Sequence, residues 1–316
     1  MTGGKTVKEA IGIDVGGTFI KAGRVAEKGE LLKELDKIPT ESHLGPQHVI
    51  NQIASAINSL KTEGSDVAGI GMPGLVSTDC STVKFPPNFP GWEVVNLGAK
   101  ITVATGIAVT VDNDANCAAL GEAKFGAGKN VDSFILATLG TGVGGAIIVN
   151  GQLYRGENGG AGEIGHTTID YRGLQCNCGS FGCVETYIGN KYLVERVWSG
   201  LSFRPENMLH ALAKTKEELT PMHITQAAND GDAFAREALR ESGYCLGVGL
   251  ANVMGLFDIR TVIIGGGVAQ AGELLFEGSR RAIAQFSQPP IAASFHLIPA
   301  ALGNNAGILG AAALVM

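Results

Sequence analysis

Residues 11–25 read IGIDVGGTFIKAGRV, and they carry the clearest indication of the chain's architecture. The apolar run IGID predicts a short strand, VGGTF predicts a glycine turn, and IKAGRV predicts a second strand. Glycines in such a turn let the backbone approach a ligand closely. A strand, a glycine-rich turn and a second strand recur in FILATLGTGVGGAIIV, residues 134–149. The two stretches suggest a duplicated arrangement.

Outward from these hairpins, strand and helix patterns alternate along the chain. Buried strands are predicted at 67–76, 261–265 and 296–302, and a further strand at 31–39. Helices are predicted at 46–61, 186–198, 223–257, 272–286 and 306–315. This alternation indicates an α/β protein. The proline-rich stretch 77–92 is expected to be a loop, and loops on a rigid scaffold often carry function.

Composition excludes several classes of protein. The chain has 316 residues, of which 45% are hydrophobic and 17% charged, so it can build sizeable cores. Its net charge of −6 argues against a general nucleic-acid binder, which usually shows a basic face. No apolar run is long enough to span a membrane, and the first residues lack a signal-peptide pattern. We therefore expect a cytoplasmic protein.

Three glycine-rich turns each follow a predicted strand, at Asp14–Thr18, Leu139–Gly145 and Gly265–Gly267. Backbone amides in such turns can donate to phosphate oxygens, and the hydroxyls of Thr18 and Thr141 add donors. Asp14, at a strand end, can hold Mg²⁺ through water. One such turn is equally consistent with a simple tight turn, but three in one α/β chain favour nucleotide binding.

Two better-known phosphate motifs do not fit. The chain lacks the Walker A pattern GxxxxGK[ST] in these turns. Gly140, Gly142 and Gly145 match GxGxxG, but the sequence that follows, AIIVNGQLY, predicts a strand where a dinucleotide fold needs a helix.

A candidate general base lies at Asp112-Asn113-Asp114, the polar end of an apolar strand. Ligands of α/β folds bind at the carboxyl ends of strands, where a carboxylate can accept the proton of a substrate hydroxyl. The neighbouring asparagine can hydrogen-bond the same substrate. Alternatively, these residues cap the helix that begins with DANCAALGEA. Both interpretations can hold for different members of the trio.

A compact set of metal ligands follows in the second half of the chain: His166, Cys176, Cys178 and Cys183. One histidine and three cysteines match a closed tetrahedral structural zinc site. Such a site leaves no open position, so the metal would fold a loop rather than perform chemistry. A transient disulfide or free thiols are the alternatives.

These motifs together resemble the ROK family of repressors, open reading frames and sugar kinases. The matching pieces run in family order: DVGGTFIKAG (14–23), GMPGLV (71–76), PPNFPGW (86–92), DNDANCAALGE (112–122), LGTGVGGAII (139–148), GAGEIGH (160–166), CNCGSFGCVE (176–185) and GNNAGILGAA (303–312). The resemblance covers nearly the whole chain, and the CxCGxxGCxE segment with its upstream ExGH is highly specific.

The resemblance implies an actin-like ATPase (ribonuclease H-like) fold with two α/β domains around a central cleft. The smaller domain is expected to comprise residues 1–117 and the C-terminal helix at about 303–316. The larger domain, with the zinc loop, would then span residues 118–302. Family members are commonly dimers or tetramers, so a homo-oligomer is expected.

The family reaction transfers the γ-phosphoryl of ATP to a sugar hydroxyl, typically the 6-hydroxyl of a hexose. Carried onto this sequence, Asp114 is the expected base. The expected sugar ligands are the Gly74 backbone, Asn88, Asn113, Glu163, His166 and Glu185. The expected phosphate-binding set is Asp14 with Mg²⁺, Gly16, Gly17, Thr18, Thr141 and Gly142, with Gly265, Gly266 and Gly267 near the adenosine. His166 would serve zinc with one ring nitrogen and sugar with the other.

Some choices stay open within this resemblance. Glucose is the first expected acceptor, and N-acetylglucosamine and N-acetylmannosamine are alternatives that differ by a 2-acetamido group. Lys21 could approach the phosphates, although a strand lysine is more commonly solvated. A non-catalytic, sugar-sensing regulator is the alternative from another class. We expect no room for the family repressors' DNA-binding extension before the first strand. A scaffold protein that uses the zinc loop as its interface is a third possibility.

Overall fold

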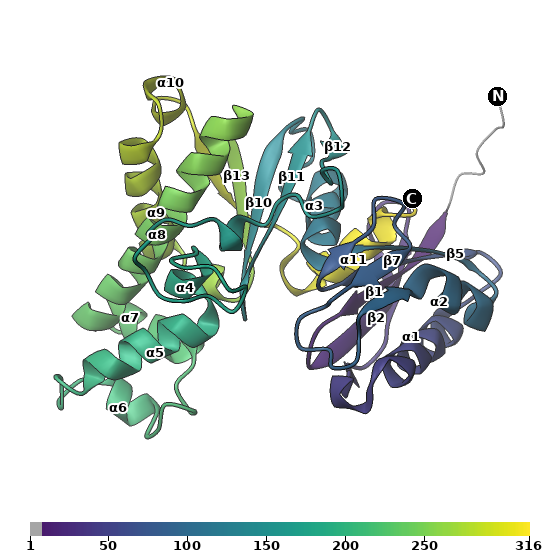
Figure 1. Cartoon of the computed structure of the whole chain (residues 1–316), viewed down its shortest axis with the longest axis horizontal. Coiled ribbons are helices and arrows are strands. Elements are labelled where there is room, and N and C mark those ends of the chain that lie inside the picture. Colours follow the sequence, from purple (N-terminus) through teal and green to yellow (C-terminus); the bar gives the residue numbers. More distant parts are fainter. Residues whose placement is uncertain (1–7) are drawn as a thin grey trace. The chain divides into compact units, whose positions relative to one another are not determined.

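The computed structural model describes residues 8–316 (Figure 1). The chain forms two compact units. Unit 1 contains the residues up to Asp132, Ala146–Gly162 and Ala300–Met316, and unit 2 contains Ser133–Gly145 and Glu163–Pro299.

Unit 1 is built on a six-stranded mixed sheet. The order is β3 (Leu31–Glu34), β2 (Phe19–Ala26), β1 (Glu9–Val15), β5 (Val67–Met72) and β9 (Ala108–Asn113), and β4 (Ile38–Pro39) pairs with β2. The predicted hairpin at 11–25 is β1 and β2, which pair antiparallel. The strand predicted at 31–39 is two short strands.

Helices cover both faces of this sheet (Figure 1). Helices α1 (Pro46–Leu60) and α2 (Leu97–Thr105) share a buried cluster with Ile11 and Ile13 of β1. Ala10, the residue before Ile11, belongs instead to a cluster with α11 (Ala306–Ala313). Successive strand residues face opposite sides of a sheet, so β1 is apolar on both faces because both are covered.

Glycines in the strands let α11 lie directly against the sheet. A Cβ atom on Gly12 would lie 2.0 Å from the carbonyl oxygen of Ile308, and one on Gly69 would lie 1.7 Å from that of Ala311. Both separations are far below any real carbon–oxygen contact, so the close approach requires glycine.

Unit 1 also contains α3 (Asp114–Phe125), because α3 packs on α11. A Cβ on Gly310 of α11 would lie 1.9 Å from the Cys117 carbonyl oxygen of α3. The C-terminal helix therefore lies in the N-terminal unit. Residues 118–132 and 146–162, expected in the larger domain, lie in unit 1.

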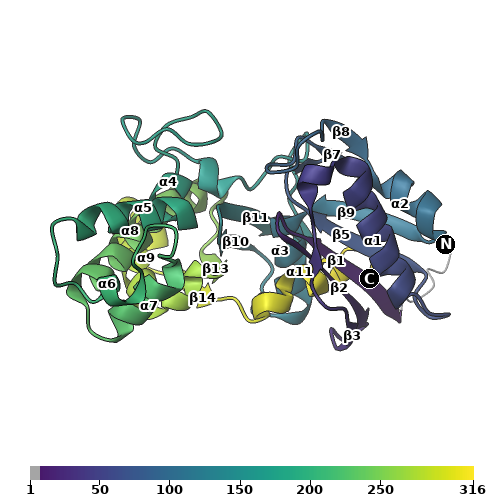
Figure 2. The ribbon, with the colours of Figure 1, turned by 90° about the horizontal axis from the view of Figure 1, so that it is seen from below.

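The second sheet has the order β12 (Gln152–Leu153), β11 (Val143–Val149), β10 (Phe134–Leu139), β13 (Thr261–Gly265) and β14 (His296–Pro299). In unit 2 the helices are α4 (Glu185–Ile188), α5 (Asn190–Leu201), α6 (Leu209–Leu212), α7 (Pro221–Asn229), α8 (Ala233–Phe257), α9 (Glu273–Phe286) and α10 (Pro289–Ala292). Figures 1 and 2 show α8 and α9 side by side.

The helix predicted at 223–257 is interrupted. Gly231 has a φ of 104°, in the left-handed region that favours glycine, and it separates α7 from α8. The Asp232 side chain then caps α8 by accepting a hydrogen bond from Ala235 N. Within residues 8–316, no helix combines the length and the apolar character needed to cross a bilayer.

Strand register brings the candidate site segments to common sheet edges. In unit 1, β1, β5 and β9 are parallel, with Asp14 opposite Gly71 and Asn113 opposite Met72. In unit 2, β10 and β13 are parallel, with Thr138 opposite Gly265. The turns after parallel neighbouring strands meet at one edge, which is where α/β folds bind ligands.

Candidate functional site

The two aspartates at the end of β9 have different surroundings. Asp112 is 2% exposed, and its Oδ2 accepts hydrogen bonds from Arg155 Nε at 2.8 Å and Nη2 at 2.7 Å. Its Oδ1 accepts from Asn116 Nδ2 and from the backbone N of Asn113, both at 2.8 Å. Burial lowers the pKa of Arg155, but the charge and hydrogen bonds of Asp112 outweigh this and raise it. Asp112 is thus buried, and both of its carboxylate oxygens accept hydrogen bonds within the fold.

Asp114 is exposed and is the first residue of α3. A helix N-terminus stabilises negative charge through its dipole and its backbone N–H groups. Oδ1 of Asp114 accepts from Ala115 N at 2.9 Å, and this local bond orients the carboxylate. The exposed position and the oriented carboxylate suit a group that accepts a proton from a bound hydroxyl.

Asn113, between them, is the helix cap. Its Oδ1 accepts from the backbone N atoms of Ala115 and Asn116, and its Nδ2 donates to the Gly74 carbonyl at 3.1 Å. The capping interpretation therefore holds for Asn113. The same bonds bring the predicted sugar contacts Asn113 and Gly74 together.

Asp14 is supported from two sides. Its Oδ2 lies 3.2 Å from Lys21 Nζ, and a Cβ on Gly307 of α11 would lie 2.3 Å from its Cγ. Lys21 therefore pairs with the predicted magnesium-binding carboxylate.

Burial raises the pKa of Cys117 well above its usual value, and the charges of Asp112, Asp114 and Asp14 add to this effect. All three carboxylates are thus close enough to raise the pKa of the Cys117 thiol by their charge.

The turn after β1 is only partly open. Gly16 N–H donates to the Phe19 carbonyl at 3.0 Å, whereas Gly17 and Thr18 are exposed. Asn88, also exposed, has its Cβ 4.0 Å from where a Cβ on Gly17 would lie. Unit 1 therefore holds a predicted phosphate contact beside a predicted sugar contact.

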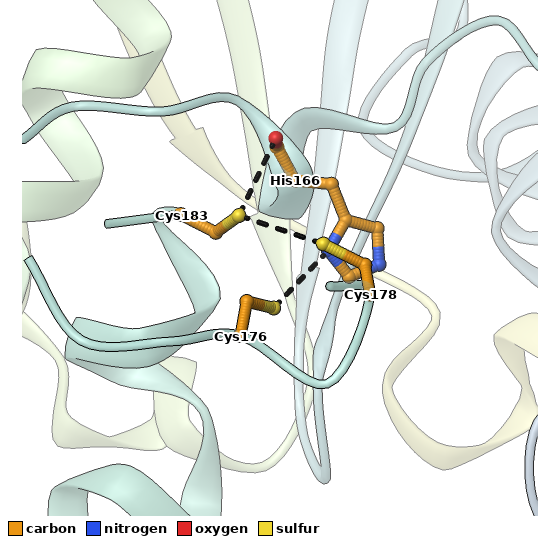
Figure 3. Close-up of side chains that lie close together, drawn as sticks. All are labelled: His166, Cys176, Cys178 and Cys183. Carbon is orange, nitrogen blue, oxygen red and sulfur yellow. Dashed lines mark hydrogen bonds between the residues drawn. The ribbon is translucent and has the colours of Figure 1, made fainter. Parts of the chain in front are cut away.

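In unit 2 the structure gathers the four predicted zinc ligands, His166, Cys176, Cys178 and Cys183 (Figure 3). Their ligand atoms all lie within 4.8 Å of one another. The Cys178 and Cys183 sulfurs are 3.7 Å apart, and Cys176 Sγ lies 3.6 Å from His166 Nδ1. Zinc with ligands at 2.0–2.3 Å sets tetrahedral neighbours roughly 3.3–3.8 Å apart, so these side chains fit a zinc ion.

His166 faces two ways. Its Nδ1 points to the cysteine cluster, and its Nε2 lies 4.0 Å from Glu163 Oε2. Partial burial raises the pKa of Glu163; the charge of His166 opposes this shift and that of Glu185 adds to it. The ring geometry agrees with one nitrogen for a metal and one beside the predicted sugar contacts.

Glu185 connects the cysteine loop to the glycine loop after β10. Its Oε2 accepts from Val143 N at 3.0 Å, and its Oε1 lies 3.8 Å from Cys176 Sγ. A Cβ on Gly142 would lie only 2.3 Å from Oε2. The sequence predicted both segments but not this bond, because Val143 and Glu185 are 42 positions apart.

The third glycine turn lies beside the same loop. Gly266 has a φ of 92°, and a Cβ there would lie 2.2 Å from the Leu139 carbonyl oxygen. Gly267 would meet nothing within 4 Å and leads into a 3₁₀ turn, Val268–Ala271. Thr141, two residues after Leu139, is exposed. Gly266 is therefore required for close packing, and Gly267 and Thr141 are the more open groups.

Each unit thus gathers its own share of the predicted residues. Unit 1 holds Asp14, Gly16, Gly17, Thr18, Gly74, Asn88, Asn113 and Asp114, and unit 2 holds Thr141, Gly142, Glu163, His166, Glu185 and Gly265–Gly267. Sequence reasoning missed Arg155, which binds Asp112. The only local indication was an arginine shortly before GAGEIGH. Its position in the sequence does not identify a hydrogen-bond partner 43 residues away.

Comparison with known proteins agrees with these motifs. A glucokinase of Streptomyces coelicolor is 40% identical over 312 residues, which are 96% of this chain and 96% of that protein. The xylose repressor of Bacillus subtilis is 30% identical over 311 residues, which are 97% of this chain and 77% of the repressor.

Solved structures add the fold. A ROK family glucokinase from Streptomyces griseus, in complex with glucose and AMPPNP, matches with a TM-score of 0.84 and 38% identity, covering 97% of this chain and 98% of that one. The predicted α/β class and actin-like ATPase fold are confirmed. The family model described as "ROK family" matches residues 10–316. The chain therefore belongs to the ROK family.

Proposed function

We propose that this protein is an ATP-dependent hexose kinase that transfers the γ-phosphoryl group of ATP to the 6-hydroxyl of glucose. The observation that carries the proposal is the position of Asp114. It is an exposed carboxylate at the start of α3 and follows β9, which runs parallel to β1, the strand that carries Asp14, with β5 between them. The similar glucokinase, solved with glucose and AMPPNP, supports glucose and ATP as the substrates.

The proposed sugar contacts are the ones that the family resemblance implies. They are Asn113, Asn88, the Gly74 backbone, Glu163, His166 and Glu185. A free hexose presents a ring of donors and acceptors, and carboxylates, an amide and an imidazole match them. The capping bonds of Asn113 hold its amide in place before the sugar arrives.

In the reaction, the 6-hydroxyl oxygen forms a bond to the γ-phosphorus, and the bond from that phosphorus to the bridging oxygen of ADP breaks. The hydroxyl proton passes to the Asp114 carboxylate, and ADP leaves with the electron pair. Phosphoryl transfer depends on alignment and charge neutralisation more than on covalent help from the protein. Asp112 cannot share the base's role because its oxygens already accept bonds from Arg155 and Asn116.

Phosphate contacts would come from Gly17, Thr18, Thr141 and Gly142, and the Gly265–Gly267 turn would lie near the adenosine. Asp14 is an oxygen ligand of the kind that Mg²⁺ prefers. Lys21 pairs with its carboxylate, and the lack of a side chain at Gly307 leaves room for it. When bound, Mg²⁺ neutralises charge on the β- and γ-phosphates.

The zinc site would have a structural role. His166, Cys176, Cys178 and Cys183 supply four ligands, so the metal would be closed to substrate and would stabilise the loop. That loop carries His166 and leads to Glu185. A cytoplasmic location and a homo-oligomer, dimer or tetramer, stay predictions.

A sugar-responsive regulator is the second candidate, and the similarity to the xylose repressor favours it. One experiment distinguishes the candidates: ADP release with Mg-ATP, measured across glucose, mannose, fructose, N-acetylglucosamine and N-acetylmannosamine. We expect strong preference for glucose. Preference for an acetamido sugar would overturn glucose as the substrate but keep the chemistry, and sugar binding without any turnover would support the regulator.

A further inference from the structure

A short segment before α1 contacts two of the predicted ligand-binding segments of unit 1. Thr40 follows β4 and is fully buried. Its hydroxyl donates to the Gly16 carbonyl at 2.7 Å, and its backbone N donates to the Thr18 carbonyl at 2.9 Å. One residue therefore binds two carbonyls of the predicted phosphate turn, those of Gly16 and Thr18.

Two residues further on, Ser42 reaches the other turn. Its hydroxyl donates to the Asn88 carbonyl at 2.9 Å. Asn88 has a φ of 67°, a left-handed backbone conformation that asparagine tolerates better than most residues. The bond from Ser42 holds the backbone of Asn88 in this conformation, which sets the direction of its side chain.

We propose that Thr40 is a positioning residue for the Gly16–Thr18 turn, and that the Thr40–Ser42 segment fixes this turn and Asn88 in one geometry suited to ATP and sugar together. The inference rests on the proposed function, since it assigns ATP to one turn and sugar to the other. Thr40 is buried and acts through Gly16 and Thr18, so it touches neither substrate. Phosphate and sugar contacts come from separate loops, and transfer requires them to be aligned.

The chain offers a matched control for the loss of the Thr40 hydroxyl. Thr105 in α2 of the same unit is 6% exposed, and its hydroxyl donates to the Ile101 carbonyl at 2.8 Å. Thr105→Val therefore deletes a buried hydroxyl bond of the same kind, in a helix with no predicted ligand contact. Thr40→Ser keeps the hydroxyl and should rescue the function that Thr40→Val loses.

The test is calorimetric binding of Mg-AMPPNP to the full chain, with KM values for ATP and glucose measured on the same variants. We expect Thr40→Val to weaken Mg-AMPPNP binding about five- to tenfold and to raise the KM for ATP similarly, with the KM for glucose within about twofold. Thr40→Ser and Thr105→Val should bind as the unchanged protein does. Ser42→Ala should instead raise the KM for glucose.

Several outcomes would overturn the inference. These are Mg-AMPPNP binding by Thr40→Val within about twofold of normal, an equal loss in Thr105→Val, or no Mg-AMPPNP binding by the unchanged protein. If Thr40→Val does not fold, Thr40→Ala deletes the same hydroxyl without the added methyl. The ratio of its Mg-AMPPNP affinity to that of Thr40→Ser then tests the role of the Thr40 hydroxyl. If the protein binds Mg-AMPPNP but phosphorylates no sugar, the proposed function fails while the binding ratios still decide the role of Thr40.

Discussion

Asp112 and Asp114 flank Asn113, but only Asp114 is exposed; Asp112 is 2% exposed and bonded to Arg155. This difference in exposure indicates different roles for the two carboxylates. Asp112 holds the end of β9 and the start of α3, and Asp114 is presented to the solvent at the strand's carboxyl end.

Asp112→Asn should destabilise the protein with little change in the chemistry that Asp114 performs. It leaves the half-buried Arg155 without its counter-charge, and breaking a buried pair costs about 3–5 kcal/mol of unfolding free energy. Because Arg155 is partly exposed, we expect the lower end of this range. Denaturant unfolding measures the effect, with the exposed Glu63→Gln as control, expected within about 0.5 kcal/mol. Unchanged stability with abolished turnover would instead make Asp112 the base.

Gly12→Ala should destabilise unit 1 strongly. The added methyl would lie 2.0 Å from the Ile308 carbonyl oxygen, so α11 would have to move off the sheet. We expect a loss of about 3 kcal/mol or more in unfolding free energy, at the upper end of overpacking effects. Gly255→Ala is the control, because a Cβ there meets nothing within 4 Å and the residue lies inside α8. It should be neutral or stabilising by up to about 1 kcal/mol. Equal losses in both variants would contradict the packing argument.

Gly142→Ala should impair sugar binding, although it adds only one methyl group. Its Cβ would lie 2.3 Å from Glu185 Oε2 and displace the carboxylate from Val143 N. We expect the KM for glucose to rise about tenfold, corresponding to the loss of one charge-assisted hydrogen bond. Gly140→Ala, where a Cβ meets nothing within 4 Å, is the matched change in the same loop. A KM for glucose unchanged in Gly142→Ala would remove Glu185 from the sugar contacts.

Cys178→Ser should abolish metal binding and lower the melting temperature. The unchanged protein should carry about one zinc per chain, measured by elemental analysis, because four ligands form one closed site. Activity should fall indirectly, since the same loop presents His166 and Glu185. Cys245 lies outside the cluster of metal ligands, so the Cys245→Ser protein is the control and should retain both zinc and activity. Normal glucose affinity in a Cys178→Ser protein that holds no metal would contradict the structural role of zinc.

Local sequence patterns predicted the elements that local chemistry controls. The hairpin at 11–25, the α1 periodicity and the Cys/His spacing each depend on neighbouring residues, and each is present in the structure. Long-range features were less accessible. The pairing of Arg155 with Asp112, and the bond from Glu185 to Val143, join residues more than 40 positions apart. A local sequence pattern does not identify hydrogen-bond partners that are so far apart in the chain.

Some glycines have a role that the predicted glycine-rich turns did not suggest. Gly16 and Gly17 lie in a turn, as predicted, but Gly12 and Gly69 lie within strands and admit α11 against the sheet. A strand glycine looks the same in sequence whether a ligand or a helix approaches it. Only the packed structure distinguishes the two.

We propose that Asp114 accepts the proton of the glucose 6-hydroxyl. The most direct measurement is steady-state ADP release with glucose and Mg-ATP by Asp114→Asn, alongside glucose binding to the same variant. We expect kcat to fall by about 10²–10⁴, the usual contribution of a general base, with glucose affinity nearly unchanged. Residual turnover within about tenfold of the unchanged protein, in a variant that binds glucose normally, would contradict the account.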